Sequence, residues 1–536
     1  MIHTEKLTLA FDGRPLFEDV NVKFLPGNCY GLIGANGAGK TTFLKLLSKT
    51  LEPTHGNVII EKNKRIAVLS QDQFAFDDIG ALEAVIMGHK ELYEVYAERN
   101  ALYAKPEMTN KEGERAGELE CLFADMDGYN AESDAASMLS ELGIKETEHE
   151  KKLKDLDSGE KIRILLAQSL FGNPDILLLD EPTNQLDYNT VLWLENFLMD
   201  FKNTVIVVSH DRHFLNKVCT HIADLDFKQI TNYVGNYDFW YQASQLSVKQ
   251  RGDQHKKQAD KIKELEAFVQ RFSANASKSK QATSRKKLIE KLRPEELPTS
   301  TRKTPFINFK PDRPCGNKIV EAINVSHSIN GQKVLENVSF YLNKKDKVAV
   351  VGRNSLSKTT LLQILAGEIT PDSGTIEWGE TVTSDYFPKD NSAYFENSLP
   401  LMDWIRQYTE NNDNQFLRGL LGRMLFSGDD VNKKVSVLSG GEKARAMFSK
   451  IMLKDSNVLM FDEPTDHLDL EAITALNDGL RTFKETLLFT SHDFQLLDTV
   501  INRVIEVTPK GMIDQQINFS DYMENPMISR KRETLY

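Results

Sequence analysis

The stretch GANGAGKT, residues 34–41, has the spacing G-x-x-x-x-G-K-[ST]. The apolar run YGLIG precedes it and the helical pattern KTTFLKLLSKTL follows it, and this strand–loop–helix context predicts a phosphate-binding loop, or P-loop. Glycines let backbone N–H groups converge on phosphate oxygens, the lysine supplies positive charge to the β- and γ-phosphates, and the threonine offers an oxygen to Mg²⁺. The predicted ligands are Gly34, Asn36, Gly37, Gly39, Lys40, Thr41 and Thr42, with Thr41 also a ligand of the metal.

Two apolar runs, DILLLDE and NVLMFDE, end in paired carboxylates and predict buried parallel strands. The aspartate of each pair suits a magnesium shell, and the glutamate is placed to polarise an attacking water. A histidine in each SHD tripeptide is predicted to contact the γ-phosphate side. The predicted metal ligands are therefore Asp180 and Asp462, and the predicted catalytic residues are Glu181, His210, Glu463 and His492.

These landmarks recur in the same order, which indicates an internal duplication. The glutamate of LDSGEK or LSGGEK precedes the catalytic glutamate by 21 residues in both halves, and the SHD histidine follows that glutamate by 29. The P-loop lysine and the catalytic glutamate are 141 positions apart in the first half and 105 in the second, so the first half has 36 additional residues. Their pattern of helix, proline-containing turn and helix predicts an arm at about residues 88–130.

The second P-loop, GRNSLSKT, has Ser355 and Ser357 where the first has glycines. A non-glycine residue held in the left-handed region costs about 1–2 kcal/mol, so a strained loop with weakened phosphate binding is expected. An alternative is that this loop still binds ATP normally through its lysine and backbone amides. The predicted ligands in this copy are Gly352, Lys358, Thr359 and Thr360, with Thr359 also a ligand of the metal.

The chain of 536 residues has a net charge of −12, but residues 245–293 carry 14 lysines and arginines against five acidic residues. Two helical patterns flank the stretch SANASKSKQATS, so a helical hairpin with a basic tip is expected. A solvated charged linker is the plainer reading of such a run. If the hairpin binds RNA, the predicted contacts are Arg271, Lys278, Lys280, Arg285, Lys286 and Lys287.

The remaining composition is that of an ordinary globular protein. The four cysteines are scattered and form no CxxC pair, which favours reduced thiols over a disulfide framework or a zinc site. No signal pattern opens the chain and no run approaches 18 apolar residues, so a cytoplasmic protein without a membrane span is expected.

The combination of LSGGEKARA, DEPT…LD and SHD resembles an ATP-binding cassette ATPase. Two cassettes in one chain, with a basic helical linker, resemble the ABC-F family over essentially the whole sequence. The resemblance implies an α/β fold of two tandem ATP-binding cassette (P-loop NTPase) domains, residues 1–244 and 316–536, joined by an α-helical hairpin linker at residues 245–315.

The resemblance also implies a function. Family members are ATPases, with ATP and Mg²⁺ as cofactors, that bind the ribosome near the tRNA exit site. Their linker reaches toward the P-site tRNA and the peptidyl-transferase centre, so the expected partners are large-subunit rRNA and that tRNA. The ATP state governs binding and release, and the chain is expected to be a monomer whose two cassettes pair.

Cassettes of this type pair head to tail, so each ATP is held by one P-loop and by the LSGGE signature of the other cassette. Composite site one would join the intact P-loop to the second signature, with Phe11 stacking on adenine and Gln71 reaching the nucleotide and the metal. Its predicted signature residues are Ser439, Gly440, Gly441 and Glu442.

Composite site two would join the serine-containing loop to LDSGE, in which Asp157 and Ser158 replace Ser and Gly. It also has Lys389 at the position of Gln71 and Ile329 at the position of Phe11. Asp157 would place a carboxylate near the polyphosphate, and Lys389 would partly offset it. We therefore expect site one to hydrolyse ATP and site two to bind weakly or turn over slowly. Gln185 and Asp466 are two further differences between the halves. Variation tolerated in a loop explains them at least as well as altered coupling between the sites does.

Three other functions stay open. An antibiotic-resistance ribosomal protection protein would share the mechanism and differ in consequence. The soluble ATPase subunit of a transporter is disfavoured by the basic linker, because such cassettes need a surface for membrane helices. A DNA-repair cassette protein would carry long coiled coils or zinc modules, and neither is visible in the sequence.

Overall fold

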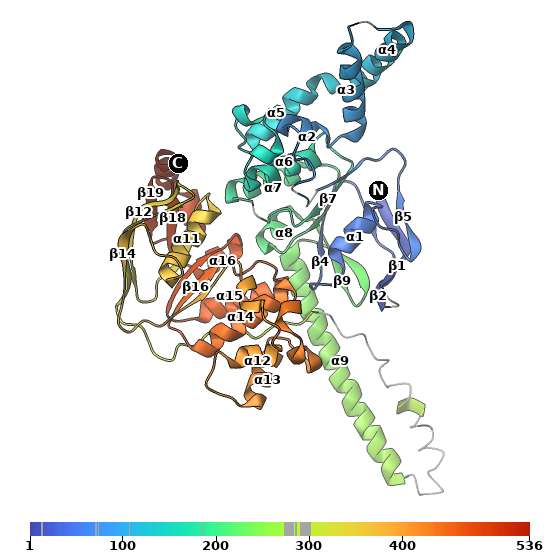
Figure 1. Ribbon diagram of the computed structural model, residues 1–536. Helices are drawn as coiled ribbons and strands as arrows, with labels where there is room; N and C mark the ends of the chain where they lie inside the picture. Colours follow the sequence, from blue (N-terminus) through green and yellow to red (C-terminus); the bar gives the residue numbers. More distant parts are fainter. Residues whose placement is uncertain are drawn as a thin grey trace.

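The computed structural model describes residues 1–11, 14–69, 72, 74–106, 108–184, 186–272, 284, 287–289 and 302–536. The chain folds into two halves of the same architecture, shown in blue to green and in yellow to red in Figure 1. Each half contains a six-stranded, mainly parallel sheet and a smaller antiparallel sheet. The sequence duplication is therefore a structural duplication.

In the first half, the large sheet has the order β10-β9-β4-β8-β7-β6, and only β10 runs antiparallel to its neighbour. The small sheet contains β1, β2, β3 and β5. The bounds of the elements are β1 (Ile2–Phe11), β2 (Arg14–Val20), β3 (Lys23–Phe24), β4 (Cys29–Ile33), α1 (Lys40–Leu47), β5 (His55–Ile60), β6 (Ile66–Val68), α2 (Ala81–Ile86), α3 (Lys90–Tyr103), α4 (Asn110–Asp125), α5 (Ala131–Glu141), α6 (Ser158–Leu170), β7 (Ile176–Asp180), α7 (Tyr188–Asp200), β8 (Thr204–Val208), α8 (Arg212–Val218), β9 (His221–Asp226), β10 (Gln229–Val234) and α9 (Tyr237–Phe272).

In the second half, the large sheet has the order β15-β16-β17-β13-β18-β19, and the small sheet the order β12-β11-β14. The bounds of the elements are β11 (Lys318–Ile329), β12 (Gln332–Asn343), β13 (Lys347–Val351), α11 (Ser355–Ala366), β14 (Ser373–Trp378), β15 (Ser384–Phe387), α12 (Leu401–Arg406), α13 (Asn414–Arg423), α14 (Gly440–Lys454), β16 (Val458–Asp462), α15 (Leu470–Thr482), β17 (Thr486–Thr490), α16 (Phe494–Val500), β18 (Arg503–Thr508), β19 (Gly511–Gln515), α17 (Phe519–Glu524) and α18 (Pro526–Leu535).

The central strands explain the apolar runs in the sequence. The strands β8 and β17 are buried along their whole length, and β7 is buried up to its final aspartate. Side chains on both faces of a covered parallel strand lie in a core, so such strands are continuously apolar. In each carboxylate pair the aspartate is the last residue of β7 or β16 and the glutamate follows it, which places both at the carboxyl edge of each large sheet.

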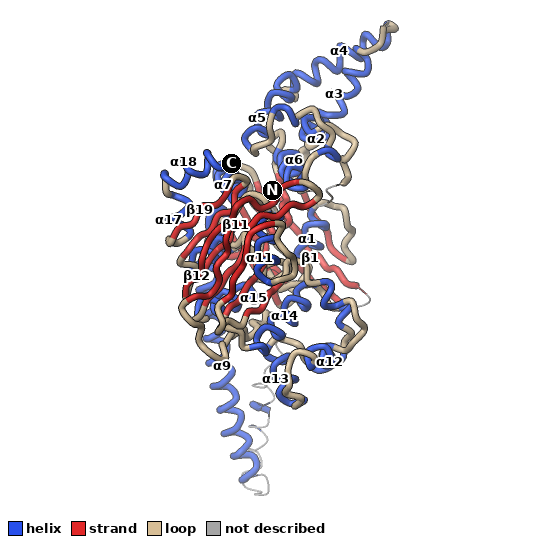
Figure 2. The backbone as a smooth tube through the Cα atoms, turned by 60° about the vertical axis from the view of Figure 1, so that its left-hand side comes forward, coloured by secondary structure: helices blue, strands red, loops and turns tan. Residues whose placement is uncertain are grey.

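The helices α3 and α4 form an arm that projects from the first half (Figures 1 and 2). A turn that includes Pro106 separates them, and Thr109 and Glu112 form a capping box at the start of α4. The guanidinium group of Arg99 on α3 forms an ion pair with Glu120 on α4, with an Nε–Oε1 distance of 2.8 Å. The observed helices lie within the range predicted for the arm.

The helix α9 is 36 residues long and extends away from the two halves (Figure 1). It begins before residue 245 because its first turn belongs to the first half, where Tyr237 and Trp240 are buried in the core. Residues 287–289 are helical, within the second predicted helical run. The side chain of Arg271 and the residues Lys278, Lys280, Arg285 and Lys286 lie outside the described part of the structure, and Lys287 is exposed.

The two halves contact each other through buried and aromatic side chains. Leu470 of the second half packs into the hydrophobic core of the first. Tyr188 of the first half packs on the core of the second, with its ring centroid 5.9 Å from that of Phe494. Within the described residues, no helix has the length and apolar character that a membrane crossing requires.

Candidate nucleotide-binding sites

The first P-loop connects β4 to α1, and Lys40 is the first residue of that helix. Gly37 and Gly39 have φ angles of 80° and 105°, a region that L-residues with side chains rarely adopt. A Cβ atom on Gly39 would lie 2.5 Å from Cδ2 of Leu16, so a side chain at this position is excluded on two grounds. The loop therefore has the open conformation that cradles phosphate.

Lys40 is buried within this loop. Its Nζ donates hydrogen bonds to the carbonyl oxygens of Gly34, at 2.8 Å, and Ala35, at 3.3 Å. Burial lowers the pKa of the lysine, while the negative charge of Glu181 opposes that shift. Thr41 and Thr42 follow in the first turn of α1, with Thr41 exposed. Among the described residues, the hydrogen bonds of the ammonium group go to neutral carbonyl groups, which an anionic phosphate can displace.

Glu181 and His210 face each other at the carboxyl edge of the sheet. The backbone N–H of His210 donates to Oε2 of Glu181 at 3.2 Å, and His210 Nε2 lies 3.2 Å from Oε1. Burial raises the pKa of Glu181 to about 8, against the attraction of Lys40. Burial also lowers the pKa of His210 to about 3, so the imidazole is neutral at pH 7.

The first site has the polar groups that a metal–nucleotide complex requires. The buried Nδ1 of His210 has no hydrogen-bond partner among the described residues. Asp180 is the last residue of β7, next to Glu181, and Thr41 is the second residue of α1, directly after Lys40. In the described chain no cluster of three His, Cys, Asp or Glu side chains forms a metal cage, and a P-loop needs none, because one hydroxyl, a carboxylate and phosphate oxygens suffice. The predicted ligand Gln71 lies outside the described residues.

The second signature lies against the first P-loop. The side chain of Asn36 donates to the carbonyl oxygen of His467 at 2.9 Å. A Cβ atom on Gly441 would lie 3.0 Å from that carbonyl oxygen and 3.7 Å from Nδ2 of Asn36. Ser439 caps α14, whose first residues are Gly440 and Gly441, and forms a capping box with Glu442. The structure thus places the second signature, and the loop that contains His467, against the first P-loop.

The aromatic residue expected to stack on adenine is accessible. Phe11 ends β1 with 53% of its surface exposed. Leu16, on the paired strand β2, contacts the P-loop at Gly39, so this hairpin lies beside the phosphate cradle. Ile329 ends β11 at the matching place in the second half. Gln185 lies outside the described residues, and Asp466 is exposed beside His467.

The second P-loop does not have the strained conformation that the sequence predicts. The helix α11 begins at Ser355, so Lys358 is its fourth residue, whereas Lys40 is the first residue of α1. Neither Ser355 nor Ser357 has a positive φ. Asn354 caps the helix by accepting from the backbone N–H of Leu356 at 2.9 Å. The serines avoid strain by extending the helix through the segment that forms the cradle in the first half.

The P-loop lysine of the second half binds a different partner. Nζ of Lys358 lies 3.5 Å from Oε1 of Glu463, and both side chains are almost fully buried. His492 Nε2 lies 3.1 Å from the same oxygen. Burial raises the pKa of Glu463, but interactions with His492, Lys358 and Lys389 outweigh it and lower that pKa to about 2. The lysine charge is therefore already neutralised, unlike that of Lys40.

Two side chains that sequence reasoning missed engage the second magnesium carboxylate. The hydroxyl of Thr490 donates to Oδ1 of Asp462 at 2.6 Å, and that of Tyr386 to Oδ2 at 3.5 Å. The positions that match them in the first half hold Val208 and Val68, which have no hydroxyl. A comparison of the two halves, residue by residue, would have revealed this difference.

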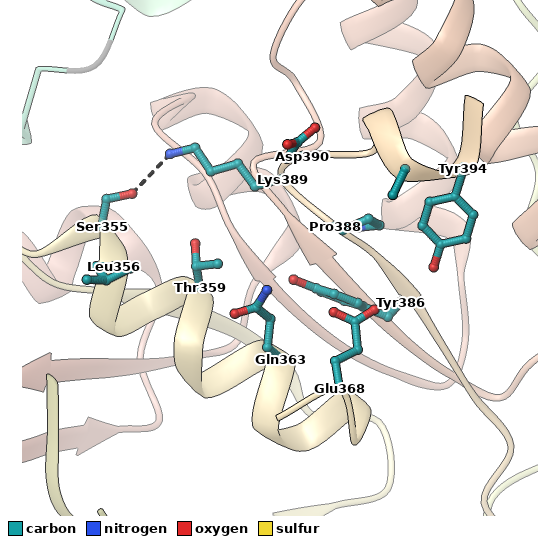
Figure 3. A pocket seen from close by; sticks show the side chains of 11 residues that line it. Ser355, Leu356, Thr359, Gln363, Glu368, Tyr386, Pro388, Lys389, Asp390 and Tyr394 are labelled. Carbon is teal, nitrogen blue, oxygen red and sulfur yellow. Dashed lines mark hydrogen bonds between the residues drawn. The ribbon is translucent and has the colours of Figure 1, made fainter. Parts of the chain in front are cut away.

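The side chain of Lys389, which stands at the position of Gln71, has a hydrogen-bond partner within the second cassette. Its Nζ donates to the Ser355 hydroxyl at 3.0 Å, and both residues line a cavity of about 480 Å³ (Figure 3). Thr359 and Tyr386 line the same cavity, between α11 and the loop after β15. This hydrogen bond joins the additional turn of α11 to the loop that contains Lys389.

A second contact, also missed from the sequence, holds the start of this P-loop. The backbone N–H of Arg353 donates to the hydroxyl of Tyr536 at 3.0 Å, and the Arg353 guanidinium lies 4.2 Å from that ring's centroid. The same hydroxyl bonds Glu506 at 3.1 Å. The backbone N–H of Arg353, at the start of the second P-loop, is thus already bonded to Tyr536, the residue after α18.

The first signature uses its unusual aspartate as a helix cap. Asp157 accepts from the backbone N–H of Glu160 at 2.8 Å and completes a capping box at the start of α6. Ser439 has this role in the second signature. The carboxylate offsets the partial positive charge of the helix end, which would otherwise attract phosphate.

Comparison with known proteins agrees with this architecture. A family model described as "ABC transporter" matches residues 17–184 and 335–466, more than half of the chain, and a second model with that description matches residues 223–309. The chain is 56% identical to "Uncharacterized ABC transporter ATP-binding protein YkpA" of Bacillus subtilis over the full length of both proteins. It is 31% identical to "ABC transporter F family member 2" of Arabidopsis thaliana, covering 99% of this chain and 80% of that protein.

The chain belongs to the ABC-F family of ATP-binding cassette ATPases. The predicted fold class, two tandem cassettes, is confirmed. This ABC-F chain also superimposes on the archaeal ribosome recycling factor aABCE1, solved with the ribosomal stalk protein aP1, with a TM-score of 0.58. That alignment covers 94% of this chain and 87% of the other at 18% identity, and it shows a shared tandem-cassette fold.

Proposed function

We propose that this ABC-F ATPase binds the ribosome near the tRNA exit site and modulates translation through ATP binding and hydrolysis. The linker, residues 245–315, would extend from cassettes at residues 1–244 and 316–536 toward the P-site tRNA and the peptidyl-transferase centre. The expected contacts are large-subunit rRNA and that tRNA, and the location is the cytoplasm. The chain would act as a monomer whose two cassettes pair.

The observation that carries this proposal is α9. Its 36 residues correspond to about 54 Å, long enough to reach deep into a large partner. The helix begins between the two cassettes and leaves the body of the molecule (Figures 1 and 2). Lys257, Lys261 and Lys263 are exposed on it, as phosphate contacts require. The structural relative named a ribosome recycling factor has the same tandem-cassette fold, which supports a ribosomal partner.

We assign hydrolysis to composite site one. Lys40 would exchange its carbonyl partners for the β- and γ-phosphates, and Glu181, oriented by His210, would accept a proton from the attacking water. Thr41, Gln71 and Asp180 would hold Mg²⁺. The metal, when bound, neutralises charge that develops on the phosphates.

We assign a reduced role to composite site two. The added turn of α11, the Lys358–Glu463 ion pair and the occupied oxygens of Asp462 all oppose phosphate and metal binding. Each contact must break before Mg²⁺–ATP can bind in the manner of site one. The asymmetry of the two sites is therefore a property of the fold as well as of the motifs.

Ribosome co-sedimentation tests the proposal. A Glu181→Gln variant should hold ATP without hydrolysing it and should pellet with 50S subunits and 70S ribosomes in ATP, but not in ADP. Glu463→Gln is the matched control, because it makes the same change at the other site. If a folded Glu181→Gln protein shows no ATP-dependent association, the ribosomal function is wrong.

A further inference from the structure

Arg302 lies in the C-terminal part of the linker, ahead of the second cassette, and its guanidinium group joins three parts of the molecule. Nη2 lies 2.5 Å from Oδ1 of Asp224 on β9, and Nη1 lies 2.5 Å from Oε1 of Glu471 on α15. Nε lies 4.0 Å from Asp226. The guanidinium also covers the indole of Trp240 on α9, 4.6 Å from the ring centroid, and the arginine side chain is only 14% exposed.

Asp224, on the strand beside the one that leads into the first P-loop, bonds both the start of α9 and Arg302. The indole N–H of Trp240, in the first turns of α9, donates to Oδ2 of Asp224 at 3.0 Å, while Arg302 holds Oδ1. Asp224 is the register partner of Ile33, the residue before the P-loop. A Cβ atom on Gly34 would lie 2.7 Å from the carbonyl oxygen of Leu225, so β9 directly supports the start of that loop.

Glu471 belongs to the part of the second cassette that closes composite site one. It lies in the first turn of α15, beside Leu470, which packs into the core of the first cassette. The loop before α15 contains His467, whose carbonyl oxygen binds Asn36 of the first P-loop. Movement of Glu471 relative to Asp224 would therefore change the separation of the two faces of site one.

We propose that Arg302 is a positioning residue that couples the position of α9 to the closure of composite site one. It does so by fastening the P-loop edge of the first cassette to α15 of the second. We call the bridge from Asp224 through Arg302 to Glu471 the clamp. An RNA partner that displaces α9 would move Trp240 and strain the clamp. The RNA part rests on the function proposed above, whereas the effect of Arg302 on ATP turnover does not.

The clamp depends on charge as well as shape. Two partly buried carboxylates from different cassettes share one guanidinium group, whose fork can bond both at once. Without it, Asp224 and Glu471 would repel each other across the interface. Toward α9, the guanidinium group of Arg302 lies over the aromatic ring of Trp240, and the face of that ring attracts the cation.

Steady-state ATPase assays of the full chain test the proposal. Arg302→Gln should lower basal kcat/KM for ATP about tenfold, with a raised KM, a size typical of coupled sites. Lys303→Gln is the matched control, because this neighbouring lysine is exposed and the charge change is identical. Glu471→Gln in the Arg302→Gln background should cost less than the two single effects combined, since both remove the same clamp. Arg302→Lys should restore part of kcat/KM.

The outcomes separate positioning from a general structural role. Thermal melts identify a variant that has lost folded protein, and KM is independent of the folded fraction. A KM for Arg302→Gln within twofold of that for Lys303→Gln would overturn the proposal, as would strictly additive effects with Glu471→Gln. Addition of 70S ribosomes should stimulate the wild type more than Arg302→Gln, by at least about fivefold. If ribosomes do not stimulate the wild type, the ribosomal function fails while the basal comparison still decides the role of Arg302.

Discussion

The same substitution at the two catalytic glutamates should have opposite consequences. Glu181→Gln is expected to abolish ATP hydrolysis and to stabilise the first cassette without nucleotide. Glu463→Gln is expected to leave most hydrolysis intact and to destabilise the second cassette. The reason is that His492 and the buried ammonium of Lys358 stabilise the ionised form of Glu463 against its burial, whereas Lys40 bonds to carbonyl oxygens and leaves Glu181 with a burial penalty.

The magnitudes follow from the pKa of each carboxyl group. The pKa of Glu463 falls from 4.5 to about 2, and one unit corresponds to about 1.36 kcal/mol, so its ionised form stabilises the folded state by about 3 kcal/mol. That stability is present above pH 4.5 and is lost as pH falls through 2. The pKa of Glu181 rises from 4.5 to about 8, so the penalty grows from pH 4.5 and reaches about 3 kcal/mol at pH 7. Glutamine removes both effects.

Calorimetry of nucleotide-free protein at pH 7 and a phosphate-release assay measure the two quantities. About 3 kcal/mol corresponds to about 6–12 °C in the melting transition of a domain of this size, upward for Glu181→Gln and downward for Glu463→Gln. Shifts in the same direction would contradict the electrostatic argument. Loss of hydrolysis in Glu463→Gln, with activity retained in Glu181→Gln, would reverse the assignment of the two sites.

Three further predictions concern the sites and α9. Because the Glu181 carboxyl must be ionised to act as a base and its pKa is about 8, kcat/KM for ATP should rise about tenfold from pH 7 to 9, and a flat pH profile would refute this. Joint replacement of Ser355 and Ser357 by glycine should shorten α11 and tighten ATP binding in the second cassette about tenfold. Calorimetric titration should then show a stoichiometry that approaches two ATP molecules per chain. An unchanged titration would show that the helical turn is not the obstacle to ATP binding. Joint replacement of Lys261 and Lys263 by Gln should lower the slope of ribosome binding against log salt by about 2, and an unchanged slope would place the RNA contacts elsewhere.

The second P-loop shows how far motif reasoning extends. Ser355 and Ser357 signal from the sequence alone that this copy departs from the intact loop. The expected penalty was local backbone strain, but the chain forms a helical turn instead, because serine is tolerated at a helix start and a glycine cradle is no longer required. The departure of this loop from the intact one was predictable, and weakened ATP binding stays a prediction, but the helical conformation was not predictable.

The duplicated cassettes, the candidate nucleotide-site residues and the basic segment between the cassettes can be predicted from the sequence, because these depend on local spacing and periodicity. The partner that each buried charge meets is visible only in the folded chain. Lys40 and Lys358 occupy equivalent motifs, yet one bonds to backbone carbonyls and the other to Glu463. The bridge from Asp224 through Arg302 to Glu471 joins residues far apart in the chain, so no short motif encodes it. Electrostatic pairing acts through space, so the folded arrangement of the two cassettes adds to the differences between the two sites that the motifs already contain.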